Sequence, residues 1–207
     1  MKLAQFWIRN QIVFDEVYTG ALLRQKRTEE LVSAEYKAAG GRWPAAQVLT
    51  ELNEYEADGV IRYLAPKLAA QDEEFRKLLE ASHGEGVDRN RRFQKMFEAL
   101  MTCWVAGTLS TPGVEPWPAF RERVRGGLRS LTSGGGSGRR VVAFTSGGFI
   151  GTAVQIALGA PDPSGLEVNW RVRNGSLTEF LFSGERLSLD TFNAIPHLDD
   201  PALRSFR

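Results

Sequence analysis

The segment FTSGGF, Phe144–Phe149, combines residue types that can bind an anion. An apolar run precedes it and a helix-forming run follows it, so the pattern predicts a strand that turns through two glycines into a helix. At such a turn the first N–H groups of the helix point beyond the strand end, and glycine lets a phosphate approach the backbone closely. The Gly147 N–H and the hydroxyls of Thr145 and Ser146 are therefore candidate phosphate donors. The same pattern is equally typical of a tight strand–helix turn without a ligand.

Arg24 is a second candidate and stands in LLRQKRT, directly after a predicted strand. Ligands of α/β proteins bind beyond the carboxyl ends of the strands, which is where this residue would lie. A guanidinium there can hold a phosphate through two hydrogen bonds. Because Lys26 and Arg27 are beside it, the segment taken alone favours a solvated helix face.

The segment LTELNEYEAD concentrates acidic residues, namely Glu51, Glu54, Glu56 and Asp58. A carboxylic acid close to a bound phosphate can protonate a leaving oxygen, which is general acid catalysis. Taken singly, each of these residues is more typical of an exposed acidic loop.

Few other side chains could act as nucleophiles or metal ligands. His83 lies in a polar loop and His197 in IPHL near the C-terminus, and neither motif resembles a nucleophile site, so we expect structural or surface roles for both. Cys103, inside an apolar helical pattern, is expected to be a small core residue, and as the only cysteine it excludes a disulfide within the chain. We expect neither a metal nor a cofactor.

Composition narrows the class of partner. The chain has 26 basic and 25 acidic residues, a balance that indicates neither nucleic acid nor a charged membrane surface as a partner. It contains no apolar run of membrane-spanning length and no signal-peptide pattern, so a cytoplasmic location is the expectation. A length of 207 residues favours one α/β or α+β domain over residues 1–207.

Periodicity predicts helices and short strands along the first two thirds of the chain, including a strand edge in QVLT before the acidic segment. The apolar spacing from Leu3 to Asn10 predicts an amphipathic helix that the sequence enters without a capping residue. A strand over residues 12–19 then leads into a helix that ends at Gly40 and Gly41. Further helical patterns cover residues 61–70, 72–82, 93–105 and 118–131.

The last third is richer in β structure. After a flexible Gly/Ser run, Val141–Phe144 is apolar throughout, which predicts an interior strand of a sheet that is covered on both faces. Alternating residues with turn signals at Asn174-Gly175 and Ser183-Gly184 predict antiparallel hairpin strands within residues 168–189. The expected architecture is a three-layer α/β/α sandwich with a mainly parallel sheet and an antiparallel edge hairpin.

Together these segments resemble the histidine phosphatase superfamily, the phosphoglycerate mutase-like proteins, from Leu3 through to His197. LLRQKRT is similar to the family's LxRAxQTA helix start, LNEYEADG to its LNE or LxE segment, and FTSGGFIG to its SHGG strand–turn–helix. The tail from Asn169 to Leu198 is similar to the family's closing hairpin. The resemblance is strongest to a bacterial subgroup that has FTSGG where most members have SHGG.

The resemblance implies a role for each candidate. Arg24 would clamp the transferred phosphoryl group, and Glu54 would be the acid. Ser146 stands in the place of the family's second histidine, which stabilises the phosphoryl group in flight. This replacement keeps a hydrogen-bond donor but removes a cation. Thr145 and Gly147 would complete the phosphate site.

The sequence departs from the family at its beginning. The family opens with a central strand that ends in RHG, whose histidine is the phosphorylated nucleophile, and this chain contains no such strand. We therefore expect an N-terminally incomplete domain, arising from a misassigned start, a truncation or natural loss. A missing first central strand would leave apolar side chains and backbone groups of its neighbours uncovered, with reduced stability or association through the gap.

Three functions follow, with different support. The complete form would transfer phosphoryl groups or hydrolyse small phosphorylated metabolites, whereas this chain, lacking the nucleophile, is expected to be inactive. The alternative is a catalytically dead phosphate-binding or interaction module. An acyl hydrolase using Ser146 has least support, because Phe144 stands where a nucleophile elbow has glycine.

The residues that select the substrate would lie within residues 61–118. Trp43 and Trp117 could serve either core packing or a homodimer interface.

Overall fold

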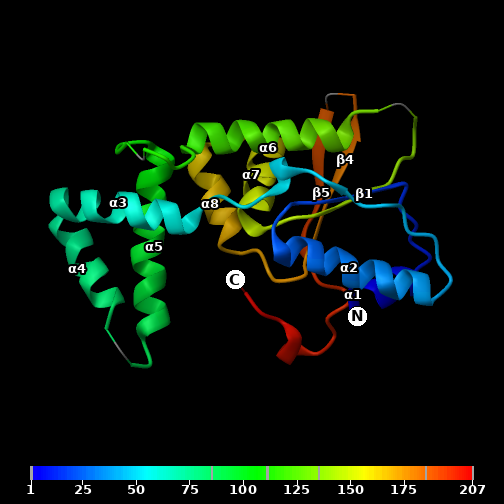
Figure 1. The fold of residues 1–207 in the computed structure, drawn as a ribbon, viewed down its shortest axis with the longest axis horizontal. Helices are drawn as coiled ribbons and strands as arrows, with labels where there is room; N and C mark the ends of the chain where they lie inside the picture. The colour runs from blue at the N-terminus through cyan, green and yellow to red at the C-terminus, as the bar shows by residue number, and fades with distance from the viewer. Residues whose placement is uncertain (1, 85, 111, 135, 185, 207) are drawn as a thin grey trace. The chain divides into compact units, whose positions relative to one another are not determined.

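The computed structural model describes residues 2–84, 86–110, 112–134, 136–184 and 186–206. The chain forms two compact units (Figure 1). Unit 1 comprises residues 1–54 and 123–207, and unit 2 comprises residues 55–122. A single domain over residues 1–207 therefore stays a prediction.

Unit 1 is built on a parallel sheet of three short strands in the order β2-β1-β3. β1 (Glu16–Thr19) lies in the centre, and its residues Val17, Tyr18 and Thr19 are buried. β3 (Val141–Phe144) pairs with β1 over its full length, and β2 (Gln47–Val48) pairs with Tyr18 and Thr19. All three strands run in the same direction, so their carboxyl ends meet at one edge of the sheet.

The prediction that Val141–Phe144 is an interior strand is wrong. β3 ends the sheet, and no described segment pairs with its second edge. Only Phe144 is buried, while Val141, Val142 and Ala143 keep part of their surface exposed. An apolar run is typical of a doubly covered strand, but its burial depends on a neighbour that this run cannot encode.

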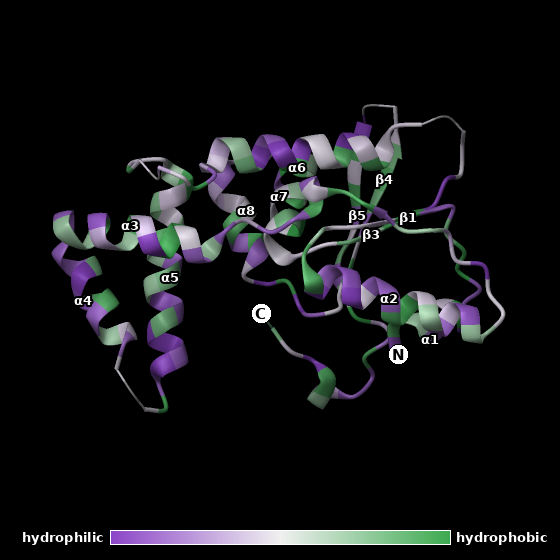
Figure 2. Ribbon diagram, viewed as in Figure 1, coloured by the Kyte–Doolittle hydropathy of each residue, from purple (hydrophilic) through white to green (hydrophobic). Residues whose placement is uncertain are grey.

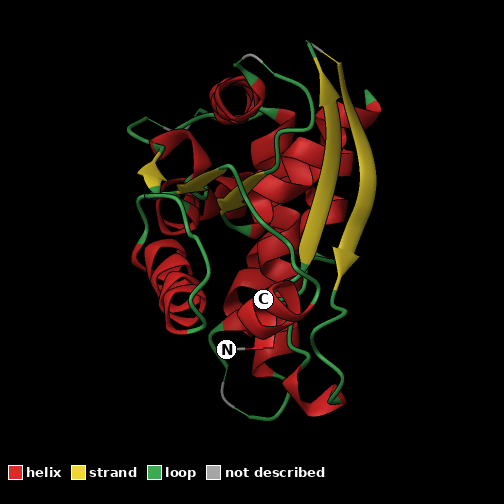
Figure 3. Ribbon diagram, turned by 90° about the vertical axis from the view of Figure 1, so that its right-hand side faces the viewer, coloured by secondary structure: helices red, strands yellow, loops and turns green. Residues whose placement is uncertain are grey.

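The antiparallel hairpin forms a separate two-stranded sheet of β4 (Leu177–Ser183) and β5 (Arg186–Ala194), drawn as two long arrows in Figure 3. The predicted hairpin strands within residues 168–189 thus lie too early, because α8 (Asp162–Asn169) continues through Val168. The register shifts around Glu179, next to the part of β5 where Asn193 has a φ of 60°. The Asn193 side chain accepts from the Arg173 N–H at 2.8 Å, which ties the end of the hairpin to the preceding loop.

Helices lie on both sides of the unit 1 strands, which Figure 1 shows between α2 (Leu23–Ala38) and the C-terminal end of α6 (Trp117–Thr132). α7 (Gly147–Leu158) follows β3 and packs closely on α8. The architecture is therefore a mixed α/β layer structure with a parallel sheet and an antiparallel hairpin, as the sequence predicts.

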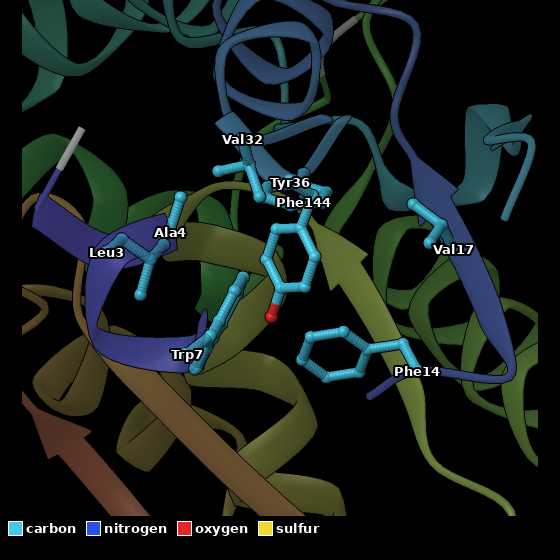
Figure 4. Packing of buried hydrophobic residues seen from close by; sticks show 8 residues of the cluster. All are labelled: Leu3, Ala4, Trp7, Phe14, Val17, Val32, Tyr36 and Phe144. Carbon is cyan, nitrogen blue, oxygen red and sulfur yellow. The ribbon is translucent and has the colours of Figure 1, made fainter. Parts of the chain in front are cut away.

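The apolar core of unit 1 joins its N-terminal helix to the sheet (Figure 4). α1 (Lys2–Arg9) buries Leu3, Ala4 and Trp7, and the Trp7 ring meets the Phe14 ring edge-on with centroids 4.9 Å apart. The cluster consists of Leu3, Ala4, Trp7, Phe14, Val17, Val32, Tyr36 and Phe144. The helix that the spacing predicts at the chain start is thus confirmed, and it packs against α2 and the strands.

Two polar contacts fasten the beginning of β3 to the beginning of β1. Arg139 donates through Nε to Glu16 Oε1 at 2.7 Å, and the Arg140 N–H donates to Asp15 Oδ2 at 2.8 Å. The pKa of Glu16 is lowered by two hydrogen bonds, of which the bond from the Tyr18 hydroxyl has the larger effect and the bond from Arg139 the smaller. These contacts favour the register that brings the carboxyl ends of β1 and β3 level.

Unit 2 is helical, with α3 (Ala57–Gln71), α4 (Glu73–Ser82), α5 (Arg89–Ala106) and the first turns of α6. Hydrophilic and hydrophobic residues alternate around α3, α4 and α5 (Figure 2), which fits the helical periodicity of the sequence. Trp117 is only 1% exposed and stacks edge-on against Trp104, so it is a core residue of this unit. Cys103 is half-buried and lies 3.1 Å from the Thr108 hydroxyl, so it is not a core residue.

Among the helices of the described ranges, none combines the length and the apolarity that a bilayer span requires.

Candidate anion site at the strand ends

Three segments meet at the carboxyl ends of the parallel strands: the turn from β1 into α2, the 3₁₀ turn Thr50–Leu52 after β2, and the turn from β3 into α7. The Leu49 N–H donates to the Thr19 carbonyl at 2.9 Å, and the Gly20 N–H donates to the Phe144 carbonyl at 3.1 Å. The Asn53 side chain accepts from the Ala21 N–H at 2.7 Å. The three candidate segments of the sequence therefore lie together, as expected for the strand ends of a parallel sheet.

Gln25 connects all three segments through one buried amide. Its Nε2 donates to the Leu52 carbonyl and to Ser146 Oγ, each at 3.0 Å, and its Oε1 accepts from the Leu22 N–H at 3.2 Å. The residue is 2% exposed. A Cβ at Gly20 would collide with Gln25 Oε1, so a larger residue there would displace this amide.

The side chain of Glu54 lies at the N-terminus of α7. Its Oε2 accepts from the Gly148 N–H at 3.2 Å, and the carboxylate is buried. The partial positive charge of a helix N-terminus favours an anion at this position. Of the four acidic residues that the sequence singles out, Glu54 alone is buried, while Glu51 is half-buried and Glu56 and Asp58 are exposed.

The two hydroxyls of the β3–α7 turn are arranged differently. Thr145 Oγ1 donates to the Leu52 carbonyl at 2.6 Å, so its proton is already used. Ser146 is 9% exposed, and its Oγ accepts from Gln25. The N–H of Gly147, the first helical residue, has no intrahelical acceptor.

Arg24 lies in the first turn of α2 with an exposed side chain. Its position at the strand-end edge agrees with the sequence, but its guanidinium makes no hydrogen bond or ion pair to the described residues, including Ser146 and Glu54. Its phosphate-clamping role therefore stays a prediction.

Gln25 and Arg123 also hold the site together, although neither is predicted from the sequence. Arg123, in α6, donates through Nη1 to the carbonyls of Glu51 at 3.0 Å and Asn53 at 2.9 Å, which holds the segment before Glu54 in place. No sequence signal distinguishes either residue, because a helical Gln or Arg is ordinarily solvated. Only their burial against carbonyls from distant segments reveals them.

The two histidines lie elsewhere. His83 is exposed at the end of α4, whereas His197 is buried near Gly175 and tilted against the Phe6 ring. Burial lowers the pKa of His197. In the described part of the chain neither histidine is hydrogen-bonded to the turn at Ser146. The described ranges also contain no group of three His, Cys, Asp or Glu side chains placed to hold a metal ion.

The amino-acid sequence matches the profile of the histidine phosphatase superfamily, branch 1, over residues 60–195. This span covers more than half of the chain, so the protein belongs to the histidine phosphatase superfamily. The matched span includes the β3–α7 turn with Ser146 but begins after Arg24 and Glu54. Comparison with curated protein sequences gave no match.

Solved structures of phosphatases share the fold. The alpha-ribazole phosphatase from Shigella flexneri superposes with a TM-score of 0.56 at 16% identity, covering 93% of this chain and 79% of that chain. A mycobacterial glucosyl-3-phosphoglycerate phosphatase gives 0.56 at 18% identity, with 93% and 82% covered. A phosphoserine phosphatase variant from Entamoeba histolytica, solved with phosphoserine, gives 0.53 at 18% identity, with 95% and 81% covered. At this identity the likeness shows the fold.

Proposed function

We propose that this chain binds phosphate or the phosphoryl group of a small metabolite at the strand-end site formed by Arg24, the Ser146-Gly147-Gly148 turn and Glu54. In a form of the domain that carries the nucleophilic histidine, the same site would serve phosphoryl transfer or phosphomonoester hydrolysis. Two of the structural neighbours are named for phosphorylated small molecules, phosphoserine and glucosyl-3-phosphoglycerate, which supports this class of ligand.

The observation that carries the proposal is the contact between Glu54 Oε2 and the Gly148 N–H at 3.2 Å. A carboxylate at the α7 N-terminus is direct support for a helix end that accepts an oxyanion. The N–H of Gly147 and the hydroxyl of Ser146 remain as further donors next to it. A phosphate bound there would lie beside the Glu54 carboxyl group, the proposed proton donor to a leaving oxygen.

Binding by this chain is expected to be weak. The family's nucleophilic histidine and its second histidine have no counterpart in this sequence, so Arg24 is the cation proposed for the site. Each lost charged hydrogen-bond partner typically costs about 1.5–3 kcal/mol, which weakens binding by about tenfold or more.

Arg24→Ala is expected to weaken phosphate or vanadate binding by at least about tenfold, because the bidentate cation is lost. Titration followed by tryptophan fluorescence or by amide chemical shifts measures the difference. Arg27→Ala is the matched control, since Arg27 is an exposed residue of the same helix that pairs with Glu30. Equal affinity of the parent and Arg24→Ala would place Arg24 outside the site and contradict the assignment.

This chain is expected to hydrolyse generic phosphate esters no faster than buffer, because covalent phosphoryl transfer requires a positioned nucleophile and neither histidine lies in the site. Release of inorganic phosphate from p-nitrophenyl phosphate checks the expectation. Turnover that survives His83→Ala and His197→Ala but disappears with Ser146→Ala would contradict it and favour a serine nucleophile.

The second candidate is a catalytically inactive binding module that uses the same anion site. The observation that favours it is the buried network of Gln25, Leu52 and Ser146, which forms without any histidine. The DNA upstream of Met1 separates the two candidates. An in-frame strand ending in Arg-His-Gly would favour the enzyme, and its absence would favour the module.

A further inference from the structure

We infer that Gln25 is a positioning residue that directs the Ser146 hydroxyl proton toward the bound anion, so that Ser146 acts as an obligatory hydrogen-bond donor in the site. The inference rests on the proposed function and names how that site recognises its ligand. It depends on the direction of each hydrogen bond around the Gln25 amide.

Two backbone groups determine how the Gln25 amide is oriented. The Leu22 N–H can only donate, so the amide atom 3.2 Å from it must be the oxygen Oε1. The Leu52 carbonyl can only accept, so the atom 3.0 Å from it must be the nitrogen Nε2. The reversed amide would place oxygen against oxygen and N–H against N–H, leaving buried groups unpaired at a cost that the native arrangement avoids.

The orientation of the amide in turn determines the role of Ser146. Nε2 carries two protons, one for the Leu52 carbonyl and one for Ser146 Oγ at 3.0 Å. Ser146 Oγ therefore accepts, and its single proton must point elsewhere. No described residue accepts that proton, so it is available to an oxygen placed over the α7 N-terminus.

Thr145 contrasts with Ser146. Its hydroxyl donates to the Leu52 carbonyl at 2.6 Å, so the second lone pair of this carbonyl is taken and the Thr145 proton is unavailable to a ligand. Of the two hydroxyls beside the helix N-terminus, Ser146 alone can donate. The site therefore presents Ser146 as a donor to ligand oxygens, such as those of phosphate or of vanadate.

A double-variant cycle tests the inference with inorganic phosphate and vanadate as the probes. Ser146→Ala is expected to weaken binding about tenfold, because a hydrogen bond to a charged ligand is lost. Gln25→Met, which keeps the side-chain volume without polar atoms, is expected to weaken binding several-fold because the serine proton is no longer directed. In the Ser146→Ala background, Gln25→Met should have no further effect on affinity. Gln71→Met, on the exposed end of α3, is the matched control.

A second variant keeps the test decisive if Gln25→Met does not fold. Gln25→Glu preserves the shape and the bond from the Leu22 N–H but places an oxygen in the Nε2 position, against the Leu52 carbonyl and Ser146 Oγ. Its carboxylate would therefore accept the Ser146 proton. Binding should then fall at least as far as in Ser146→Ala, while circular dichroism confirms the fold.

Three outcomes would overturn the inference. Unchanged affinity in Gln25→Met or Gln25→Glu would show that Gln25 does not direct the proton. An equal loss from Gln25→Met with and without Ser146 would show that Gln25 does not act through the serine. Either of these two results would contradict the role of Gln25 but not the proposed phosphate site, provided that Arg24→Ala still weakens binding. A parent chain without saturable binding would overturn the site and the inference together.

Discussion

Trp7→Ala is expected to lower the free energy of unfolding by about 3–5 kcal/mol, the usual cost of truncating a large buried aromatic side chain. Trp7 is 4% exposed and lies in the cluster that joins α1 to Phe14, Tyr36 and Phe144. Because domains of this size are stable by only about 5–15 kcal/mol, the variant should be partly or wholly unfolded at 37 °C.

Urea unfolding followed by circular dichroism at 222 nm measures this effect without relying on the tryptophan that is removed. Leu23→Ala is the control, because Leu23 is 83% exposed and its truncation should change stability by less than about 0.5 kcal/mol. If Trp7→Ala and Leu23→Ala had the same midpoint, α1 would not be part of the core of unit 1.

Gly151→Ala is expected to destabilise unit 1 by about 3 kcal/mol, the upper part of the usual range for overpacking. A Cβ at this position in α7 would collide with the Gly165 carbonyl oxygen and lie 2.9 Å from the Asn169 backbone nitrogen. Both contacts are to the backbone of α8, which cannot rotate away as a side chain could. The two helices would therefore have to separate, and the start of α7 with Ser146 would shift with them.

Gly126→Ala is the matched control for Gly151→Ala. Gly126 also lies within a helix, α6, but a Cβ there meets no atom within 4 Å. It should raise stability by about 0.5–1 kcal/mol, because alanine loses less backbone entropy than glycine in a helix. Thermal melts of the two variants should thus move in opposite directions. A stabilising effect at both positions would contradict the close α7–α8 packing.

Much of the fold could be predicted from the sequence because helical periodicity is local. The spacing of apolar residues predicts α1, α5 and α6 to within a few residues, and the glycines after Leu158 and Ala106 occupy the left-handed cap positions that end α7 and α5. The sequence predicts an antiparallel hairpin correctly but begins it too early in the chain. The reason is that the apolar spacing of residues 162–169 does not distinguish the end of a helix from a strand.

The candidate site was predictable in its segments. The strand-to-helix turns at Gly20 and Ser146 and the acidic segment at Glu54 are visible in the residue types, and parallel strands necessarily bring their carboxyl ends to one edge. Gln25 and Arg123 were not predictable, since their partners are carbonyls of residues that lie at least 27 positions away in the sequence.

The amino-acid sequence by itself determined the α/β class, the helices and the Ser-Gly-Gly turn, because each of these depends on residues close together along the chain. The tertiary structure decided that β3 ends its sheet, that Glu54 accepts from the Gly148 N–H at the start of α7 and that Ser146 Oγ accepts from Gln25. These features depend on which distant backbone groups meet one another. A hydroxyl or amide side chain can pair with several partners, so its hydrogen bonds are fixed only when the fold brings a particular donor and acceptor together. No local pattern of residues specifies those partners.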